Sequence, residues 1–210
     1  MARPIDFNLY LITDRKVVPE GKTLLETLEA ALLGGVHAIQ LREKDMDAAD
    51  LLPLARQLRE LTNDYQAKLL INDRIDMALA VEADGVHLGG HSLPIAVARK
   101  LLGAEKLIGV STHNQQQLGA AVAGGADFIT FGPIWYTLSK TLPGEPVGLD
   151  ALQDACAQST VPVFALGGVT PKGIPELLAH DCRHVACIGG ILQAEDPTAA
   201  VRTFLSQLDA

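Results

Sequence analysis

Cationic and polar side chains recur directly after short apolar runs in this sequence. Arg42 and Lys44 follow one such run, Asn72 and Asp73 end and follow the next, and His113 lies just past a later one. Cations bind phosphate oxygens, a carboxylate is a ligand that Mg²⁺ prefers, and imidazole exchanges protons near neutral pH. These residue types predict chemistry on a phosphorylated small molecule, with His113 as the general acid or base, if the fold brings them together.

A second group of candidates lies later in the chain. Lys140 adds a third cation to the set, and the pairs Gly167-Gly168 and Gly189-Gly190 follow the last two apolar runs. Because glycine lets backbone N–H groups approach an anion closely, we expect a phosphate to bind at these pairs. Alternatively, the two glycine pairs only form tight turns and bind no phosphate.

Two simpler interpretations of the early candidates stay open at the level of sequence. Arg42 and Lys44 could pair with Glu43 or Asp45 in a solvated turn, which would leave no charge for a substrate. Asp73 could be the N-cap of a helix over residues 76–82, alone or in addition to binding a metal.

Apolar runs and helical patterns alternate along the whole chain. The expected strands are Asn8–Thr13, Val36–Leu41, Lys68–Asn72, Gly85–Leu88, Leu107–Val110, Phe128–Phe131, Val161–Ala165 and His184–Ile188. The clearest helical stripes are Thr23–Leu33, Asp47–Thr62, Asn114–Ala123 and Ala199–Leu208. This order predicts one α/β domain over residues 1–210, a (β/α)₈ TIM barrel whose strand ends carry the site.

A doubly wound open sheet is the alternative fold. It predicts a glycine-rich phosphate loop after the first strand, but Asp14-Arg15-Lys16 stands there. The barrel is therefore the better prediction.

Composition narrows the class of protein. The 210 residues carry a net charge of −8, which is the wrong sign for a nucleic-acid binder. Charges interrupt every apolar run before it reaches membrane-spanning length, and the three cysteines show no paired spacing. We expect a cytoplasmic enzyme acting on small phosphorylated molecules, without a nucleic-acid or membrane partner; a homo-oligomer stays open.

The strand-end strings, in order, are similar to those of a known family. YLITD, QLREKD, INDRIDMAL, ADGVHLGG, IGVSTH and GADFITFGPI, with the late glycine pairs, resemble the thiamine phosphate synthase family, which includes thiazole tautomerases. Synthases of this family join hydroxymethylpyrimidine diphosphate to thiazole phosphate and release pyrophosphate.

The resemblance implies a role for each matching residue. The pyrimidine diphosphate would be held by Gln40, Arg42, Lys44, Asn72 and Lys140. Asp73 would bind Mg²⁺, and Ser111 is a further substrate-binding candidate. The thiazole phosphate would be received by Thr137, Ser139, Gly168, Gly189 and Gly190.

The chain departs from the family pattern at Ser92, where synthases usually carry a second Mg²⁺ carboxylate. Gly189-Gly190 also departs, because synthases usually have a serine there. These changes favour a metal-free tautomerase in which His113 moves the proton, whereas the retained cations and Asp73 favour a synthase. The synthase ranks first; a non-catalytic sensor of thiamin precursors is the third alternative.

Overall fold

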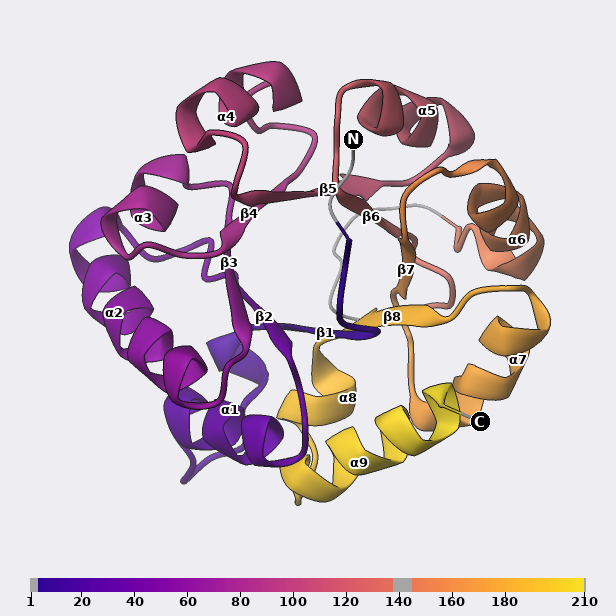
Figure 1. Ribbon diagram of the computed structural model, residues 1–210. Helices are drawn as coiled ribbons and strands as arrows, with labels where there is room; N and C mark the ends of the chain where they lie inside the picture. The colour runs from indigo at the N-terminus through magenta and orange to yellow at the C-terminus, as the bar shows by residue number, and fades with distance from the viewer. Residues whose placement is uncertain (1–3, 138–144, 210) are drawn as a thin grey trace.

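Eight parallel strands form a closed barrel surrounded by helices in the computed structural model, which describes residues 4–137 and 145–209 (Figure 1). Each strand pairs with the next one along the chain, and β8 pairs with β1. The prediction of a (β/α)₈ TIM barrel is confirmed. All carboxyl ends of the strands therefore open at the same end of the barrel.

The elements alternate as the hydrophobic pattern predicted. The strands are β1 (Leu9–Ile12), β2 (Ala38–Leu41), β3 (Lys68–Asn72), β4 (Gly85–Leu88), β5 (Leu107–Thr112), β6 (Phe128–Phe131), β7 (Val163–Leu166) and β8 (His184–Cys187). The α-helices are α1 (Leu24–Leu33), α2 (Ala48–Asp64), α3 (Ile75–Ala80), α4 (Ile95–Leu102), α5 (Gln115–Ala123), α6 (Gly148–Gln158), α7 (Ile174–Ala179), α8 (Gly189–Leu192) and α9 (Pro197–Leu208). The described residues also form the short 3₁₀ helices η1 (Arg15–Val17) and η2 (Pro171–Gly173).

Polar N-caps fix where three of the helices begin. Thr23 forms a capping box with Glu26 at α1, Asp47 accepts two backbone N–H groups at α2, and Asn114 accepts one at α5. The sequence placed each of these residues at the start of its helix. Strand ends were less accurate: β5 extends to Thr112, and β7 runs from Val163 to Leu166 rather than from Val161 to Ala165.

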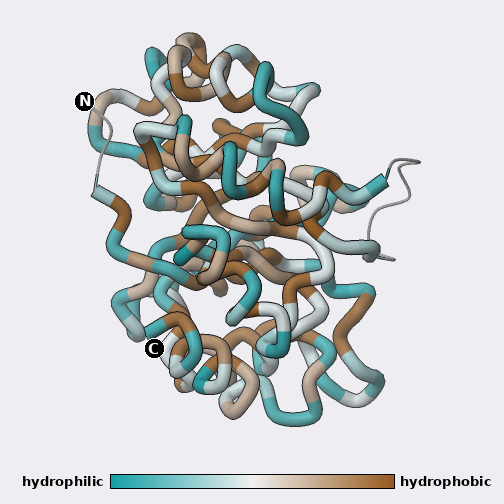
Figure 2. Tube along the Cα trace, turned by 90° about the vertical axis from the view of Figure 1, so that its right-hand side faces the viewer, coloured by the Kyte–Doolittle hydropathy of each residue, from teal (hydrophilic) through white to brown (hydrophobic). Residues whose placement is uncertain are grey.

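The barrel interior changes character along its axis. Its amino-end half is filled by the aromatic rings of Phe7, Tyr10, Phe128 and Phe164, whose neighbouring centroids lie 5.3–6.0 Å apart. A larger apolar cluster fills the layer between strands and helices. Figure 2 shows the hydrophobic segments gathered in the middle of the molecule and hydrophilic ones on the outer turns. This cluster of four aromatic rings, called the aromatic plug below, packs beneath the polar residues nearer the carboxyl end.

The three cysteines lie within the described residues and form no disulfide bond with one another. Cys182 and Cys187 are buried and Cys156 is partly buried, and all three are free thiols. Among the described residues, no helix is both long and apolar enough to cross a membrane.

Candidate active site

A layer of polar side chains crosses the barrel just above the aromatic plug. Strand register places Gln40 beside Ile12, Asn72 beside His87, and Ser111 beside Thr130. The predicted residues Gln40, Asn72 and Ser111 therefore lie in the last two positions of β2, β3 and β5, at the carboxyl end of the barrel.

Two hydrogen-bonded groups make up the buried part of this layer. Gln40 Nε2 donates to Tyr10 Oη at 3.1 Å, and the ring of His87 contacts Ser111 Oγ at 3.0 Å through Nε2. Complete burial and the nearby charge of Arg42 lower the pKa of His87 to about 3. His87 is thus a neutral core histidine, and Ser111 is oriented by it.

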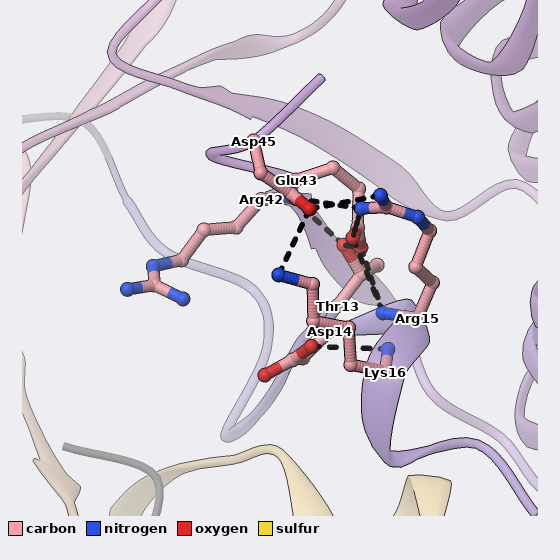
Figure 3. Close-up of polar contacts among 7 residues, drawn as sticks. All are labelled: Thr13, Asp14, Arg15, Lys16, Arg42, Glu43 and Asp45. Atoms are coloured by element: carbon pink, nitrogen blue, oxygen red, sulfur yellow. Dashed lines mark hydrogen bonds and ion pairs between the residues drawn. The ribbon is translucent and has the colours of Figure 1, made fainter. Parts of the chain in front are cut away.

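Arg42 and Lys44 do not pair with the acidic residues between and beside them. Glu43 and Asp45 both bind Arg15, with shortest nitrogen–oxygen distances of 3.0 and 2.7 Å. Figure 3 shows the Arg42 side chain extending away from this cluster. The solvated-turn interpretation is therefore wrong, because the acidic neighbours are occupied by other cations.

Lys44 lies near the positive charge of Arg42 and the negative charge of Asp73. Partial burial and, next, the charge of Arg42 lower the pKa of Lys44, while Asp73 acts in the opposite direction. Two cations held near each other gain energy when an anion binds between them. The pair fits a phosphate or diphosphate group.

Asp73 directly follows β3 and has an unusual backbone conformation. Its φ is +67°, in the left-handed region that non-glycine residues seldom adopt, and its N–H donates to His87 O at 2.9 Å. The N-cap position of α3 belongs to Arg74, which makes no side-chain cap, so the N-cap interpretation of Asp73 is wrong. Asp73 is exposed, and its charge acts on Lys44.

His113 links the ends of two strands. Its ring Nδ1 donates to the carbonyl of Gly132, which follows β6, and its backbone N–H donates to Gln117 Oε1 at 2.8 Å. A carbonyl can only accept a hydrogen bond, so this contact places the ring proton of a neutral imidazole on Nδ1. Nε2 is then the nitrogen that could exchange a proton with a substrate.

The two glycine pairs after β7 and β8 have different structural surroundings. Gly167 and Gly168 have φ of +99° and +70°, and a Cβ on Gly168 would come within 2.8 Å of Trp135 Cβ. Close packing alone therefore requires glycine at this turn. Gly189 and Gly190 are the first residues of α8, where backbone N–H groups have no acceptor inside the helix. A phosphate at these pairs stays a prediction.

Ser92 has a local structural role. Its Oγ accepts the N–H of Gly89 at 2.6 Å, and its own N–H donates to Gly89 O at 3.1 Å. The hydroxyl thus closes the turn after β4. Of the other predicted site residues, Thr137 is half-buried, whereas Ser139 and Lys140 lie outside the described residues.

Sequence reasoning missed the cluster beside Arg42. Thr13, Arg15, Glu43 and Asp45 come from the ends of β1 and β2, and their side chains bond to each other (Figure 3). The available signal was the charge pattern: Arg15 and Lys16 follow the first strand, and two acidic residues alternate with two cations after the second.

A family model described as thiamine monophosphate synthase matches residues 9–191. The chain belongs to this family. A Geobacter sulfurreducens protein provisionally named as a thiamine-phosphate synthase is 53% identical over 204 residues, which cover 97% of this chain and 95% of that protein.

Two further members of the thiamine monophosphate synthase family extend the comparison. The thiamine-phosphate synthase of Synechocystis is 44% identical over 96% of this chain, which spans 57% of that longer relative. The solved structure of thiamine phosphate pyrophosphorylase from Pyrococcus furiosus superimposes with a TM-score of 0.86 at 33% identity, covering 96% of this chain and 95% of that one. The resemblance predicted from the strand-end strings is confirmed.

Proposed function

We propose that this chain is a thiamine-phosphate synthase, which joins hydroxymethylpyrimidine diphosphate to thiazole phosphate and releases pyrophosphate. The names of its full-length relatives support this activity. One structural observation carries it: Arg42 and Lys44 face no acidic partner in Glu43 or Asp45, because Arg15 and Lys16 bind those carboxylates. The cations are therefore available to a diphosphate.

The reaction breaks the bond between the pyrimidine methylene carbon and a diphosphate oxygen. The bonding electron pair leaves with pyrophosphate, and the lone pair of the thiazole nitrogen then forms the new C–N bond. Arg42 and Lys44, together with Lys140, would neutralise the charge that develops on the leaving group. Electrostatic stabilisation of this kind lowers the barrier without any covalent step on the protein.

Polar side chains at the carboxyl end of the barrel would hold the pyrimidine and thiazole rings in the orientation that the reaction requires. Gln40, Asn72 and Ser111 present amide and hydroxyl groups from β2, β3 and β5, which suits hydrogen bonding to a pyrimidine. The thiazole phosphate would bind Thr137, Ser139 and the glycines 168, 189 and 190. Holding both substrates in one geometry supplies the orientation that a reaction between two molecules otherwise lacks.

Asp73 fits a Mg²⁺ site that the substrate completes. Its carboxylate is exposed near Lys44, and the described residues contain no cluster of three His, Cys, Asp or Glu side chains that could bind a metal alone. Mg²⁺ commonly uses one or two carboxylates plus phosphate oxygens, so a single carboxylate suffices when a diphosphate is present. The ion would supply additional positive charge to the leaving group.

His113 would position the end of β5 and could exchange a proton through Nε2. In a synthase this proton transfer is not the difficult step, because diphosphate departure requires positive charge rather than a base. The free thiols fit the reducing cytoplasm as the compartment.

An assay of the purified protein tests the proposal. With hydroxymethylpyrimidine diphosphate, thiazole phosphate and Mg²⁺, we expect stoichiometric pyrophosphate and thiamine phosphate, and little product after chelation of the metal. A parallel assay offers the thiazole carboxylate phosphate tautomer. Isomerisation of that compound without any pyrophosphate release from the first pair would make the protein a tautomerase, the alternative that Ser92 favours.

A further inference from the structure

Thr13 joins the ends of β1 and β2 through one buried hydroxyl. Its Oγ1 accepts the backbone N–H of Arg42 at 2.8 Å and donates to Glu43 Oε1 at 2.7 Å. Thr13 is completely buried, and the Glu43 side chain is only 2% exposed. The bond to Glu43 is therefore shielded from competing water, and the bond to the Arg42 N–H is partly shielded.

The Glu43 carboxylate is fully occupied on its other side. It accepts the backbone N–H of Arg15 at 3.1 and 3.2 Å and the Arg15 guanidinium at 3.0 Å. A buried carboxylate is costly unless it is paired and hydrogen-bonded, so these contacts hold Glu43 in one place. Asp45 binds the same guanidinium with two bonds of 2.7 and 2.9 Å, and Lys16 Nζ at 2.8 Å.

Arg42 points in a different direction from all of these groups. In Figure 3 its side chain extends away from the cluster, while its backbone lies beside Thr13. Arg42 and Glu43 directly follow β2 and their side chains extend in opposite directions, so fixing Glu43 on one side orients Arg42 on the other. The same contacts keep the Glu43 carboxylate from pairing with Arg42.

We propose that Thr13 and Glu43 are positioning residues for Arg42: they hold its backbone and keep its guanidinium free for the diphosphate. The inference rests on the proposed function, in which Arg42 binds that group. Neither residue needs to touch the substrate, since each acts through the N–H of Arg42 or through the carboxylate beside it.

The test compares two substitutions of Thr13 that differ in whether the hydroxyl is kept. Thr13→Val keeps the shape of the side chain and removes both hydrogen bonds, whereas Thr13→Ser keeps the hydroxyl. We expect Thr13→Val to weaken the binding of inorganic pyrophosphate with Mg²⁺ about tenfold and to raise KM for the pyrimidine diphosphate similarly, with Thr13→Ser near the wild type. Thr62→Val is the matched control, because it removes another buried threonine hydroxyl, on α2.

A double-mutant cycle separates positioning from general stability. In an Arg42→Ala background, Thr13→Val should cause no further loss of pyrophosphate affinity, because the effect passes through Arg42. Additive losses in the cycle, or a lower Tm with unchanged affinity, would overturn the inference. If Thr13→Val does not fold, Glu43→Gln enters the same cycle with the same expectation.

Measurements on the wild-type protein distinguish a failure of the positioning role from a failure of the proposed activity. If it forms product and binds pyrophosphate but Thr13→Val behaves like the wild type, only the positioning inference fails. If the wild type neither binds pyrophosphate nor forms product, the proposed function fails and the inference with it.

Discussion

Arginines at the two ends of the barrel differ in whether a carboxylate pairs with them. At the amino end, Arg59 pairs with Asp84 at 2.7 Å and Arg99 pairs with Asp127 at 2.6 Å. At the carboxyl end, Arg42 forms no ion pair within residues 4–137 and 145–209, and it lowers the pKa of Lys44. Arg59 and Arg99 are paired at the amino end, whereas Arg42 at the carboxyl end is available, because its acidic neighbours bind Arg15.

The amino-end pairs repeat one structural device. Each aspartate directly precedes a strand and accepts the N–H of a residue on the strand before it, at 2.8 Å: Asp84 from Leu69, and Asp127 from Ile108. Each arginine comes from a helix earlier in the chain, α2 or α4. A carboxylate that binds both a guanidinium and the sheet backbone fixes a helix against a strand pair.

In this fold, the pairing of a charged side chain indicates whether it serves stability or ligand binding. A saturated pair between a helix and a strand contributes to stability, whereas a cation whose acidic neighbours are bound elsewhere is available to a ligand. Substitutions at the two ends should therefore separate stability from activity.

The largest effect is expected at the carboxyl end. Arg42→Ala should lower kcat/KM for the synthase reaction about 10²–10³-fold, because it removes a cation from the leaving diphosphate. Steady-state kinetics and Tm are measured together, with the exposed α2 residue Arg56 changed to Ala as control. A wild-type rate would remove Arg42 from the site.

At the amino end, Asp127→Asn should destabilise the protein by about 2–4 kcal/mol, since it leaves the Arg99 charge partly buried without its partner. Denaturant unfolding measures this loss. The kcat of the folded fraction should stay close to wild type. A marked loss of kcat without destabilisation would contradict the division between the two ends.

His113 should show a smaller effect. In a synthase, His113→Asn is expected to reduce the rate about tenfold or less, because the amide can still donate to the Gly132 carbonyl and no base is needed for diphosphate departure. Tm serves as the control. A loss of about 10²–10⁴-fold would instead identify His113 as a proton carrier and revive the tautomerase alternative.

The smallest effect is expected at Ser92. An aspartate can accept the Gly89 N–H as the serine does and still offer an oxygen to Mg²⁺. We expect Ser92→Asp to lower the Mg²⁺ concentration for half-maximal rate by a few-fold and to raise the rate modestly. A metal titration of both forms checks this; identical curves would mean that the turn does not face the metal.

The sequence alone determined the architecture and the edge on which the candidates lie. Apolar runs and amphipathic stripes repeat at the length of a strand–helix unit, and local caps such as Thr23, Asp47 and Asn114 mark helix starts. Such signals depend only on neighbours in the chain, so β3, β4 and β6 were predicted to the residue. Parallel topology then placed every strand end on one face.

Only the tertiary structure decided which charges are free. In sequence, Glu43 stands between Arg42 and Lys44, and adjacency favours pairing among the three. The fold instead brings Arg15 from the end of β1, 28 residues away, to bind Glu43, and gives Asp73 a left-handed backbone rather than an N-cap position. Pairing between strand ends depends on burial and on distances across the barrel, which no local pattern encodes.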